Sequence, residues 1–255
     1  NTLAKNKDKY IEFYSEFGRL LKEGAYQEFE HKDSIVELLR FKSTKEEGFV
    51  SLKDYVNRMD ADQKSIYYIT GHNEVSLSDS PLLEMYDEKN IEVLILDDEI
   101  DEIVITSIPK YDDKELKSVN RSGAADELSD KSNKKNIKEL EPLIKKIKKV
   151  LGDKVKDVRI SKRLNDSPSC LVADENDPTS QMQEIMKSMG QPNLPDIKPI
   201  FEINPKNKIV KKLQNMKRGK TFDDISLLLF EQALIQEGGK LDNPADFVKR
   251  LNSVM

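Results

Sequence analysis

Few side chains in the sequence have the types and spacing that catalysis or metal binding needs. The histidines are His31 and His72, and neither has a cysteine or carboxylate at the spacing of a metal site. We expect both to be ordinary surface or hydrogen-bonded histidines. The single cysteine, Cys170, leaves no internal disulfide, which is typical of a reducing compartment, and we expect a cytoplasmic location. The common glycine-rich phosphate loops are also missing from the sequence. From these observations together we predict no catalytic residue and no metal site.

Two polar segments follow apolar segments that are typical of strands. Residues 71–73 (Gly-His-Asn) follow 65–70, at a position where open α/β sheets often bind ligands. This leaves open an α/β enzyme with a small-ligand site in that loop. Five carboxylates lie in residues 97–102, directly after 91–96, and such a cluster can bind a divalent cation, although its spacing matches no known calcium loop. We expect an ordinary loop at Gly71 and a solvated acidic turn at 97–102.

Three of the seven methionines gather in one short segment. With an isoleucine they recur at i, i+3, i+4 and i+7, as Met182, Ile185, Met186 and Met189. This spacing places them on one face of a helix, which can be the core contact of a purely structural module. It can also be a surface that accepts varied apolar partners, because methionine is flexible and polarisable. Polar loops containing proline lie on both sides, and they favour the exposed surface.

The composition limits the classes of partner. The chain has 255 residues, 35% of them charged, and a net charge of −5, so we expect no nucleic-acid partner. Four lysines in residues 145–149 are interpreted as the solvated side of a helix, because no aromatic residues accompany them for stacking on bases. No run of about 18 apolar residues is present that could span a bilayer, and we expect no membrane partner.

The distribution of aromatic residues predicts two separately cored units. Thirteen of the seventeen Phe and Tyr residues lie at or before Tyr111. Residues 118–136 are polar and contain two large aliphatic side chains, so we predict a linker there. The predicted units are therefore residues 1–117 and 137–255.

The first unit has the pattern of a small three-layer α/β structure preceded by helices. Helices are predicted at 10–21, closed by Gly24, at 35–39, and at 52–59 behind a Ser51–Asp54 capping signal. Strands at 65–70 and 91–96 flank a helix that begins at Ser80-Pro81, so we expect them to be parallel neighbours. Residues 103–105 (Ile-Val-Ile) are predicted to add an edge strand.

The second unit has the pattern of an α+β domain that ends in a helical hairpin. A helix is predicted from Ile137 to Leu151, in which Pro142 is tolerable only in the first turn or at a kink. Three strands and two terminal helices should follow, at 155–160, 170–172, 200–203, 222–236 and 244–255.

Several blocks of the sequence resemble the heat-shock protein 90 family of molecular chaperones in its bacterial HtpG form. The most specific block is Ser51–Met59 followed by Gln63–Gly71, which contains Tyr-Tyr-Ile-Thr-Gly. Further similar stretches follow in order along essentially the whole chain, among them 13–18, 38–41, 80–84, 91–94, 158–164, 201–205 and 232–234.

The resemblance implies the C-terminal half of such a chaperone, with the small part of its middle domain at 1–117 and its dimerisation domain at 137–255. The nucleotide-binding domain, and the arginine loop that assists ATP hydrolysis, would lie upstream of Asn1. ATP and Mg would therefore bind outside this chain, and we expect no enzyme activity from it. The start at Asn1, with neither an initiator methionine nor a signal core, fits a chain that begins partway through a longer protein.

The resemblance also implies site residues and partners. The family's client-contacting helix matches Thr179–Met189, and Ile103 stands where bacterial relatives carry a client-binding Trp. The family's last two helices pair two copies into a four-helix bundle, which maps here onto Phe222, Ile225, Leu228, Leu229, Phe247 and Leu251. The implied partners are a second copy, partly unfolded client proteins and the bacterial seventy-kilodalton chaperone system. The C-terminal Asn252–Met255 lacks the acidic tail that recruits cochaperones to eukaryotic members.

Overall fold

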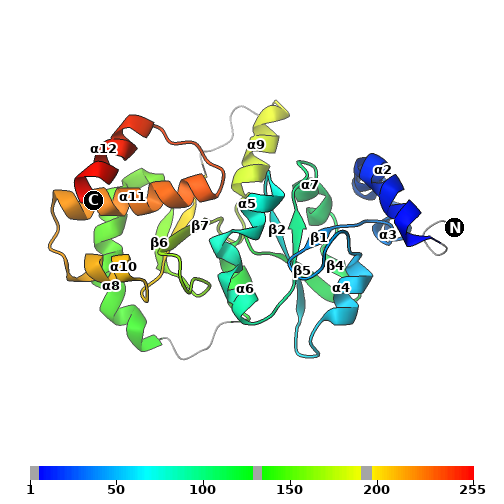
Figure 1. Cartoon of the computed structure of the whole chain (residues 1–255), viewed down its shortest axis with the longest axis horizontal. Coiled ribbons are helices and arrows are strands. Elements are labelled where there is room, and N and C mark those ends of the chain that lie inside the picture. The colour runs from blue at the N-terminus through cyan, green and yellow to red at the C-terminus, as the bar shows by residue number, and fades with distance from the viewer. Residues whose placement is uncertain (1–5, 129–133, 191–196) are drawn as a thin grey trace. The chain divides into compact units, whose positions relative to one another are not determined.

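The computed structural model describes residues 6–128, 134–190 and 197–255 (Figure 1). The chain divides into two compact units. The first contains residues up to Ser78 together with Asn90–Ser118, and the second contains Asp79–Lys89 together with Val119–Met255. The predicted combination of an α/β unit and an α+β unit is confirmed.

The segment predicted as a linker is partly packed. Ser118 is the last residue of a strand, and Val119, Ala124 and Ala125 are buried in the second unit. Residues 129–133 of the segment lie outside the described residues.

The first unit begins with helices and a short strand. These are α2 (Lys7–Gln27), α3 (Lys32–Val36), β1 (Lys42–Ser43) and α4 (Leu52–Arg58). The predicted end of the first helix at Gly24 is wrong, because α2 continues to Gln27. The capping box at the start of α4 is confirmed, since Ser51 Oγ accepts from the Asp54 N–H and the Asp54 carboxylate accepts from the Ser51 N–H.

A five-stranded sheet forms the centre of the first unit. Its order is β1-β3-β2-β5-β4, and it adds to β1 the strands β2 (Ser65–Thr70), β3 (Val93–Leu96), β4 (Lys110–Tyr111) and β5 (Lys114–Ser118). The predicted parallel pairing of β2 with β3 is confirmed, and the chain crosses between them through α5 (Glu74–Ser78), η1 (Pro81–Leu83) and α6 (Glu84–Glu88). Ser80 caps η1 as predicted.

The edge strand predicted at residues 103–105 is wrong. These residues belong to helix α7 (Asp101–Thr106). Their β-branched side chains favour a strand locally, but the helix places Val104, Ile105 and the following Ile108 in the core of the unit, where they are buried. Tertiary burial outweighs local propensity here.

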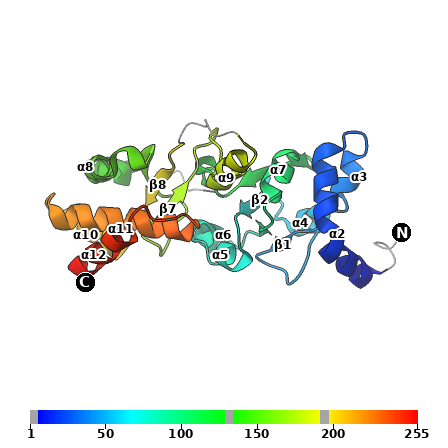
Figure 2. The same cartoon turned by 90° about the horizontal axis from the view of Figure 1, so that it is seen from above.

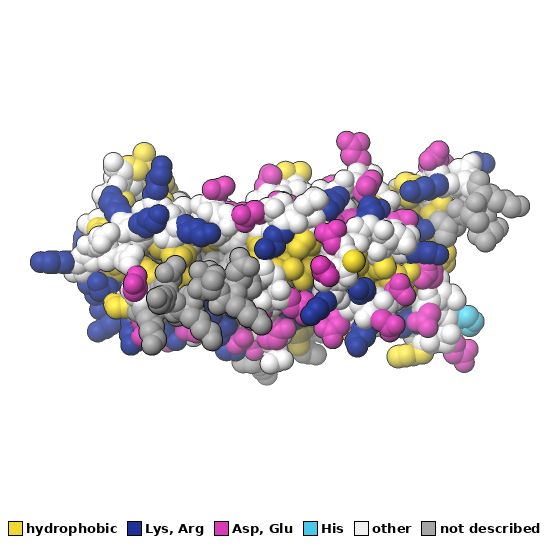
Figure 3. Space-filling model, turned by 90° about the horizontal axis from the view of Figure 1, so that it is seen from below, with side chains coloured by type: hydrophobic (Ala, Val, Ile, Leu, Met, Phe, Trp, Pro, Cys, Tyr) yellow, Lys and Arg dark blue, Asp and Glu magenta, His cyan; other side chains and the backbone are white. Residues whose placement is uncertain are grey.

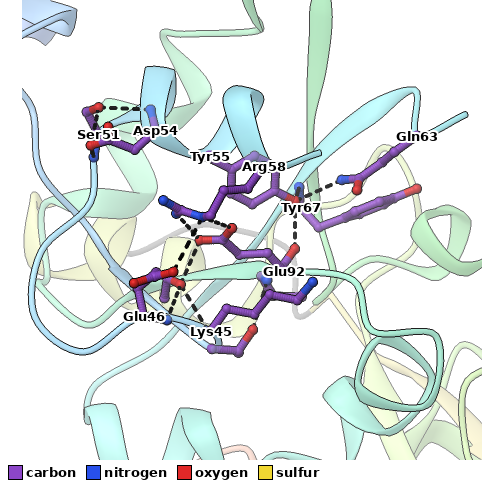
Figure 4. A network of polar contacts seen from close by, with 12 residues as sticks. Lys45, Glu46, Ser51, Asp54, Tyr55, Arg58, Gln63, Tyr67 and Glu92 are labelled. Carbon is purple, nitrogen blue, oxygen red and sulfur yellow. Dashed lines mark hydrogen bonds and ion pairs between the residues drawn. The ribbon is translucent and has the colours of Figure 1, made fainter. Parts of the chain in front are cut away.

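The block that carries the resemblance forms a polar network in the first unit (Figure 4). The buried Tyr55 hydroxyl donates to the Glu92 carbonyl at 2.6 Å and accepts from the Tyr67 N–H and the Gln63 amide at 3.1 and 3.0 Å. The Arg58 guanidinium donates two hydrogen bonds to the Glu92 carboxylate. The network ties α4 to β2 and to the residue before β3, so the block has a structural explanation.

The second unit is a three-stranded sheet with helices. Its order is β6-β8-β7, in which β8 (Ile200–Ile203) is parallel to β6 (Asp157–Ile160) and antiparallel to β7 (Ser169–Val172). Besides η1 and α6, which lie in Asp79–Lys89, the remaining elements are η2 (Ser122–Ala125), α8 (Lys134–Leu151), η4 (Gly152–Lys154), α9 (Ser180–Ser188), α10 (Lys208–Asn215), α11 (Lys220–Gln236) and α12 (Pro244–Val254).

One core lies between the sheet and helices α8, α10 and α11 of the second unit. Helix α8 packs on β6, α11 packs on β7, and the two helices contact each other. The rings of Phe201 on β8 and Phe230 on α11 meet edge to face at 6.1 Å. Pro142 lies inside α8 rather than in its first turn.

Candidate functional site

The acidic segment after β3 is paired with lysines. Asp101 Oδ1 lies 2.7 Å from Lys22 Nζ, and Asp97 Oδ2 lies 2.8 Å from Lys42 Nζ. The expected solvated turn is wrong for Asp101 and Glu102, which are both buried. Burial raises the pKa of Asp101, and the ammonium group of Lys22 opposes that shift. The Lys22–Asp101 pair joins α2 to α7, and the Lys42–Asp97 pair joins β1 to the residue after β3, so both carboxylates have a structural explanation.

The loop after β2 has a packing explanation as well. A Cβ atom on Gly71 would lie 2.6 Å from Leu77 Cδ2, so the glycine lets α5 approach the end of the strand. His31 and His72 are both exposed. Among the residues that the structure describes, no group of three or more His, Cys, Asp or Glu side chains could hold a metal ion, and no helix is long and apolar enough to cross a membrane.

Of the methionines predicted as a contact surface, Met182 and Met186 lie on α9 and Met189 is its C-cap residue. We call Met182, Ile185, Met186 and Met189 the methionine stripe. Met182, Ile185 and Met186 are partly exposed, and Met189 is 71% exposed. The one buried residue of α9, a helix that the structure describes in full, is Gln181. In both ribbon views α9 stands away from α8, α10 and α11 of the same unit (Figures 1 and 2). The stripe residues are also absent from the core cluster of the second unit, so the apolar face of α9 is not part of that core.

The start of α9 is well defined. The Thr179 side chain accepts a hydrogen bond from the Met182 N–H at 3.1 Å and so caps the helix. In the loop before it, Lys156 Nζ lies 2.7 Å from the carboxylates of both Asp174 and Asp177. The hydrogen bond from Lys156, together with one from the Glu175 N–H, holds the pKa of Asp174 below its usual value. A short helix is thus presented from an ordered loop.

The two helices of the terminal hairpin, α11 and α12, differ in how far their apolar residues are buried. On α11, the predicted interface residues Phe222, Ile225, Leu228 and Leu229 are buried within the chain itself. They have little surface left for a second copy. On α12, which the structure describes in full, no residue is buried, and Phe247 and Leu251 are partly exposed. Further exposed apolar side chains on the hairpin are Ile235, Val248 and Met255.

The remaining predicted contact residue, Ile103, lies on α7 in the first unit and is partly exposed. The lysines Lys145, Lys148 and Lys149 of α8 are exposed, as expected. Lys146 is partly buried and lies over the ring of Phe222. On the face drawn in Figure 3, Lys and Arg side chains gather over the second unit, at the left.

A buried polar cluster in the second unit was not found from the sequence. Arg163 is completely buried and its Nε lies 3.2 Å from the Glu202 carboxylate, which also accepts from Ser161 Oγ at 2.9 Å. Cys170 is buried beside Glu202, and burial together with that carboxylate raises the pKa of its thiol. Burial also raises the pKa of Glu237 to about 7, while Arg163 opposes the shift. A lone Arg in a strand–loop sequence carries no periodic signal that would reveal such burial.

Comparison with known proteins gives one consistent family. The family model described as Hsp90 protein matches residues 1–255. The chaperone protein HtpG of Treponema denticola is 52% identical over 99% of this chain. The HtpG proteins of Borrelia garinii and Dechloromonas aromatica are both 45% identical, over 98% and 99% of the chain. The chain spans 40–41% of the length of these relatives.

Proposed function

The chain belongs to the Hsp90 family of molecular chaperones, bacterial HtpG type, and from this premise we propose that it binds partly unfolded client proteins and forms a homodimer. The methionine stripe is the proposed client contact in the second unit, and Ile103 is a further contact in the first. In this proposal ATP and Mg bind to parts of the protein outside this chain. The protein works in the cytoplasm, with the seventy-kilodalton chaperone system as a further partner.

The observation that carries the client-binding proposal is the exposure of the methionine stripe. An apolar helix face that is partly exposed and lies outside the core of its unit can bury further against an unfolded segment. Full burial of an exposed side chain of this size contributes about 1.5–3 kcal/mol, so the largely exposed Met189 has the most to gain. Methionine adapts its shape to different partners, so the stripe suits clients that share no sequence.

The client-binding proposal is tested with Met182→Asp and Met186→Asp combined in one variant. We expect the variant to lose most of its ability to suppress aggregation of an unfolded model protein, because two charges then lie in the apolar face. A matched control, Ser180→Asp with Ser188→Asp, adds the same charges to α9 away from the stripe and should keep that ability. Equal activity of the two variants would contradict the assignment.

The dimerisation proposal depends on α12. Its partly exposed Phe247 and Leu251, with the exposed Val248, form an apolar surface that a second copy can cover. Val248→Glu with Leu251→Glu should therefore reduce the molar mass in solution from that of a dimer to that of a monomer. Lys211→Glu, at an exposed position of α10, is the control and should remain dimeric. A dimer that survives the α12 substitutions would show that the interface lies elsewhere.

A further inference from the structure

Arg121 holds the loop that precedes the methionine stripe. Its Nη1 donates to three backbone carbonyls of that loop, those of Asp174, Glu175 and Asp177; the distances to the first two are 3.3 and 2.9 Å. A guanidinium group suits this task because its donors have a fixed planar geometry. Two residues after the loop, the cap residue Thr179 begins α9.

The backbone beside Arg121 is joined to the same loop. The Ser122 N–H donates to the Ala173 carbonyl at 2.9 Å, and the Ala173 N–H donates to the Asn120 carbonyl at 2.8 Å. The Gly123 N–H donates to the Glu175 carboxylate at 3.0 Å. A Cβ atom on Gly123 would lie 2.1 Å from Glu175 Oε2, so this approach requires a glycine or a displaced carboxylate. Segment 119–123 and the loop therefore form one hydrogen-bonded structure.

The buried Arg163 fixes that segment from the other side. Its guanidinium donates to the carbonyls of Val119, Arg121 and Ser122, and its charge is balanced by Glu202. A buried guanidinium is retained in a fold when its donors are satisfied in this way. Val119 directly follows Ser118, the last residue of β5. The segment that Arg163 fixes is thus the one through which the chain leaves the sheet of the first unit.

We propose that Arg121 is the positioning residue of the methionine helix α9, and that α9 takes its orientation from segment 119–123. The inference rests on the proposed client-binding role of the stripe and deepens it. A displacement of segment 119–123 carries Arg121 with it, and the loop and the cap of α9 follow. The chain leaving β5 thereby regulates how the client surface is presented.

The test is amide hydrogen exchange of the full chain, compared between Arg121→Met and Arg159→Met. Arg121→Met keeps the length of the side chain and removes the donors. We expect exchange in residues 180–188 to become about tenfold faster, since charge-assisted hydrogen bonds of the loop are lost, while the amides of β6–β8 stay protected. Arg159 is exposed and pairs with Asp157, so Arg159→Met is the control and should exchange like the parent chain.

Two further variants separate positioning from general stability. Arg121→Lys keeps the charge with fewer directed donors and should restore part of the protection of α9. Ser122→Pro removes the N–H that reaches Ala173 at a position where η2 begins and proline is tolerated, and it should also loosen α9. Unchanged exchange of α9 in Arg121→Met, or equal loosening of α9 and β6–β8, would overturn the inference.

Different measurements test the positioning role of Arg121 and the client-binding role of the methionine stripe. Hydrogen exchange reports on the position of α9 with no client present. If Arg121→Met loosens α9 but the variant with Met182→Asp and Met186→Asp still suppresses aggregation, the positioning role stands and the client-binding role is wrong. If the aspartate variant loses activity while Arg121→Met leaves α9 unchanged, the client-binding role stands and the positioning role is wrong.

Discussion

Helices α9 and α11 both carry apolar residues at helical spacing, but only those of α11 belong to the core of the second unit. Phe222, Ile225 and Leu229 of α11 lie in the core of the second unit, against β7 and α8. The methionine stripe of α9 is partly to largely exposed. Periodicity therefore identifies an apolar face, whereas the neighbouring elements decide whether that face is core or contact surface.

The residue types agree with this difference. The buried face of α11 is built from Phe, Leu and Ile, which fill a core in well-defined rotamers. The exposed face of α9 is built mainly from methionine, which specifies one packing poorly and adapts to several. The composition of the face of α9 therefore suits the proposed binding of varied clients, and that of α11 suits a fixed core.

The largest expected effect comes from truncating the core face of α11. Phe222→Ala removes a completely buried ring, and we expect the free energy of unfolding of the second unit to fall by about 3–5 kcal/mol. Denaturant unfolding followed by circular dichroism measures this loss. A loss below about 1 kcal/mol would mean that Phe222 contributes no more to stability than the residues of α9. This result would contradict the assignment of α11 to the core.

The next largest effect on stability is expected from the buried Arg163–Glu202 ion pair, whose arginine also binds the carbonyls of segment 119–123. Arg163→Met leaves the Glu202 carboxylate buried without its cation, and we expect a loss of about 3 kcal/mol in the free energy of unfolding. Adding Glu202→Gln should recover part of this loss, because the uncompensated charge is then removed. If the double variant is as unstable as Arg163→Met, the ion pair is not the source of the effect.

A smaller effect is expected at the end of α11, where Glu237 follows the helix. Because burial raises its pKa from 4.5 to about 7, the folded chain keeps a proton that the unfolded chain loses between these pH values. The contribution of Glu237 to the free energy of unfolding is therefore fully present below pH 4.5 and is lost as the pH rises through about 7. The side chain keeps some exposure, so we expect about 1–2 kcal/mol.

Glu237→Gln should remove this pH dependence and stabilise the chain at pH 8. Unfolding curves at pH 5 and pH 8 measure the difference, and Glu141→Gln at an exposed position of α8 is the control. A pH dependence identical to that of the parent chain would show that Glu237 titrates normally.

The smallest effect on stability is expected on α9. Met186→Ala should change the free energy of unfolding by less than about 1 kcal/mol, because the side chain is only partly buried. The difference between the stability losses of Met186→Ala and Phe222→Ala compares the two helices most directly. A loss as large as that of Phe222→Ala would mean that the stripe is core.

Much of the fold was predictable because its signals are local. The Ser51–Asp54 capping box, the Ser80-Pro81 and Asn243-Pro244 helix starts, and the β2 and β3 strands depend on neighbouring residues, and all were found. The β4–β5 hairpin was missed because its turn uses Asp112 and Asp113, both at positive φ, in place of the usual Asn-Gly or Asp-Gly.

The candidate site was predictable only in part. The methionine stripe follows from spacing, but its exposure depends on which elements surround α9. The interface predicted on α11 was implied by the family resemblance, and there the structure buries four of the residues within the chain. Arg121 and Arg163 act through carbonyls more than 40 residues away along the chain, and no sequence spacing reveals such contacts.

The most direct test of the central claim, that α9 presents a client surface while α11 builds the core, is site-specific photo-crosslinking. A photoreactive amino acid is placed at Met186 and, as the exposed control, at Lys211 of α10, and a permanently unfolded model protein is added. We predict strong crosslinks from position 186 and few from position 211. Equal crosslinking from the two positions would contradict the claim.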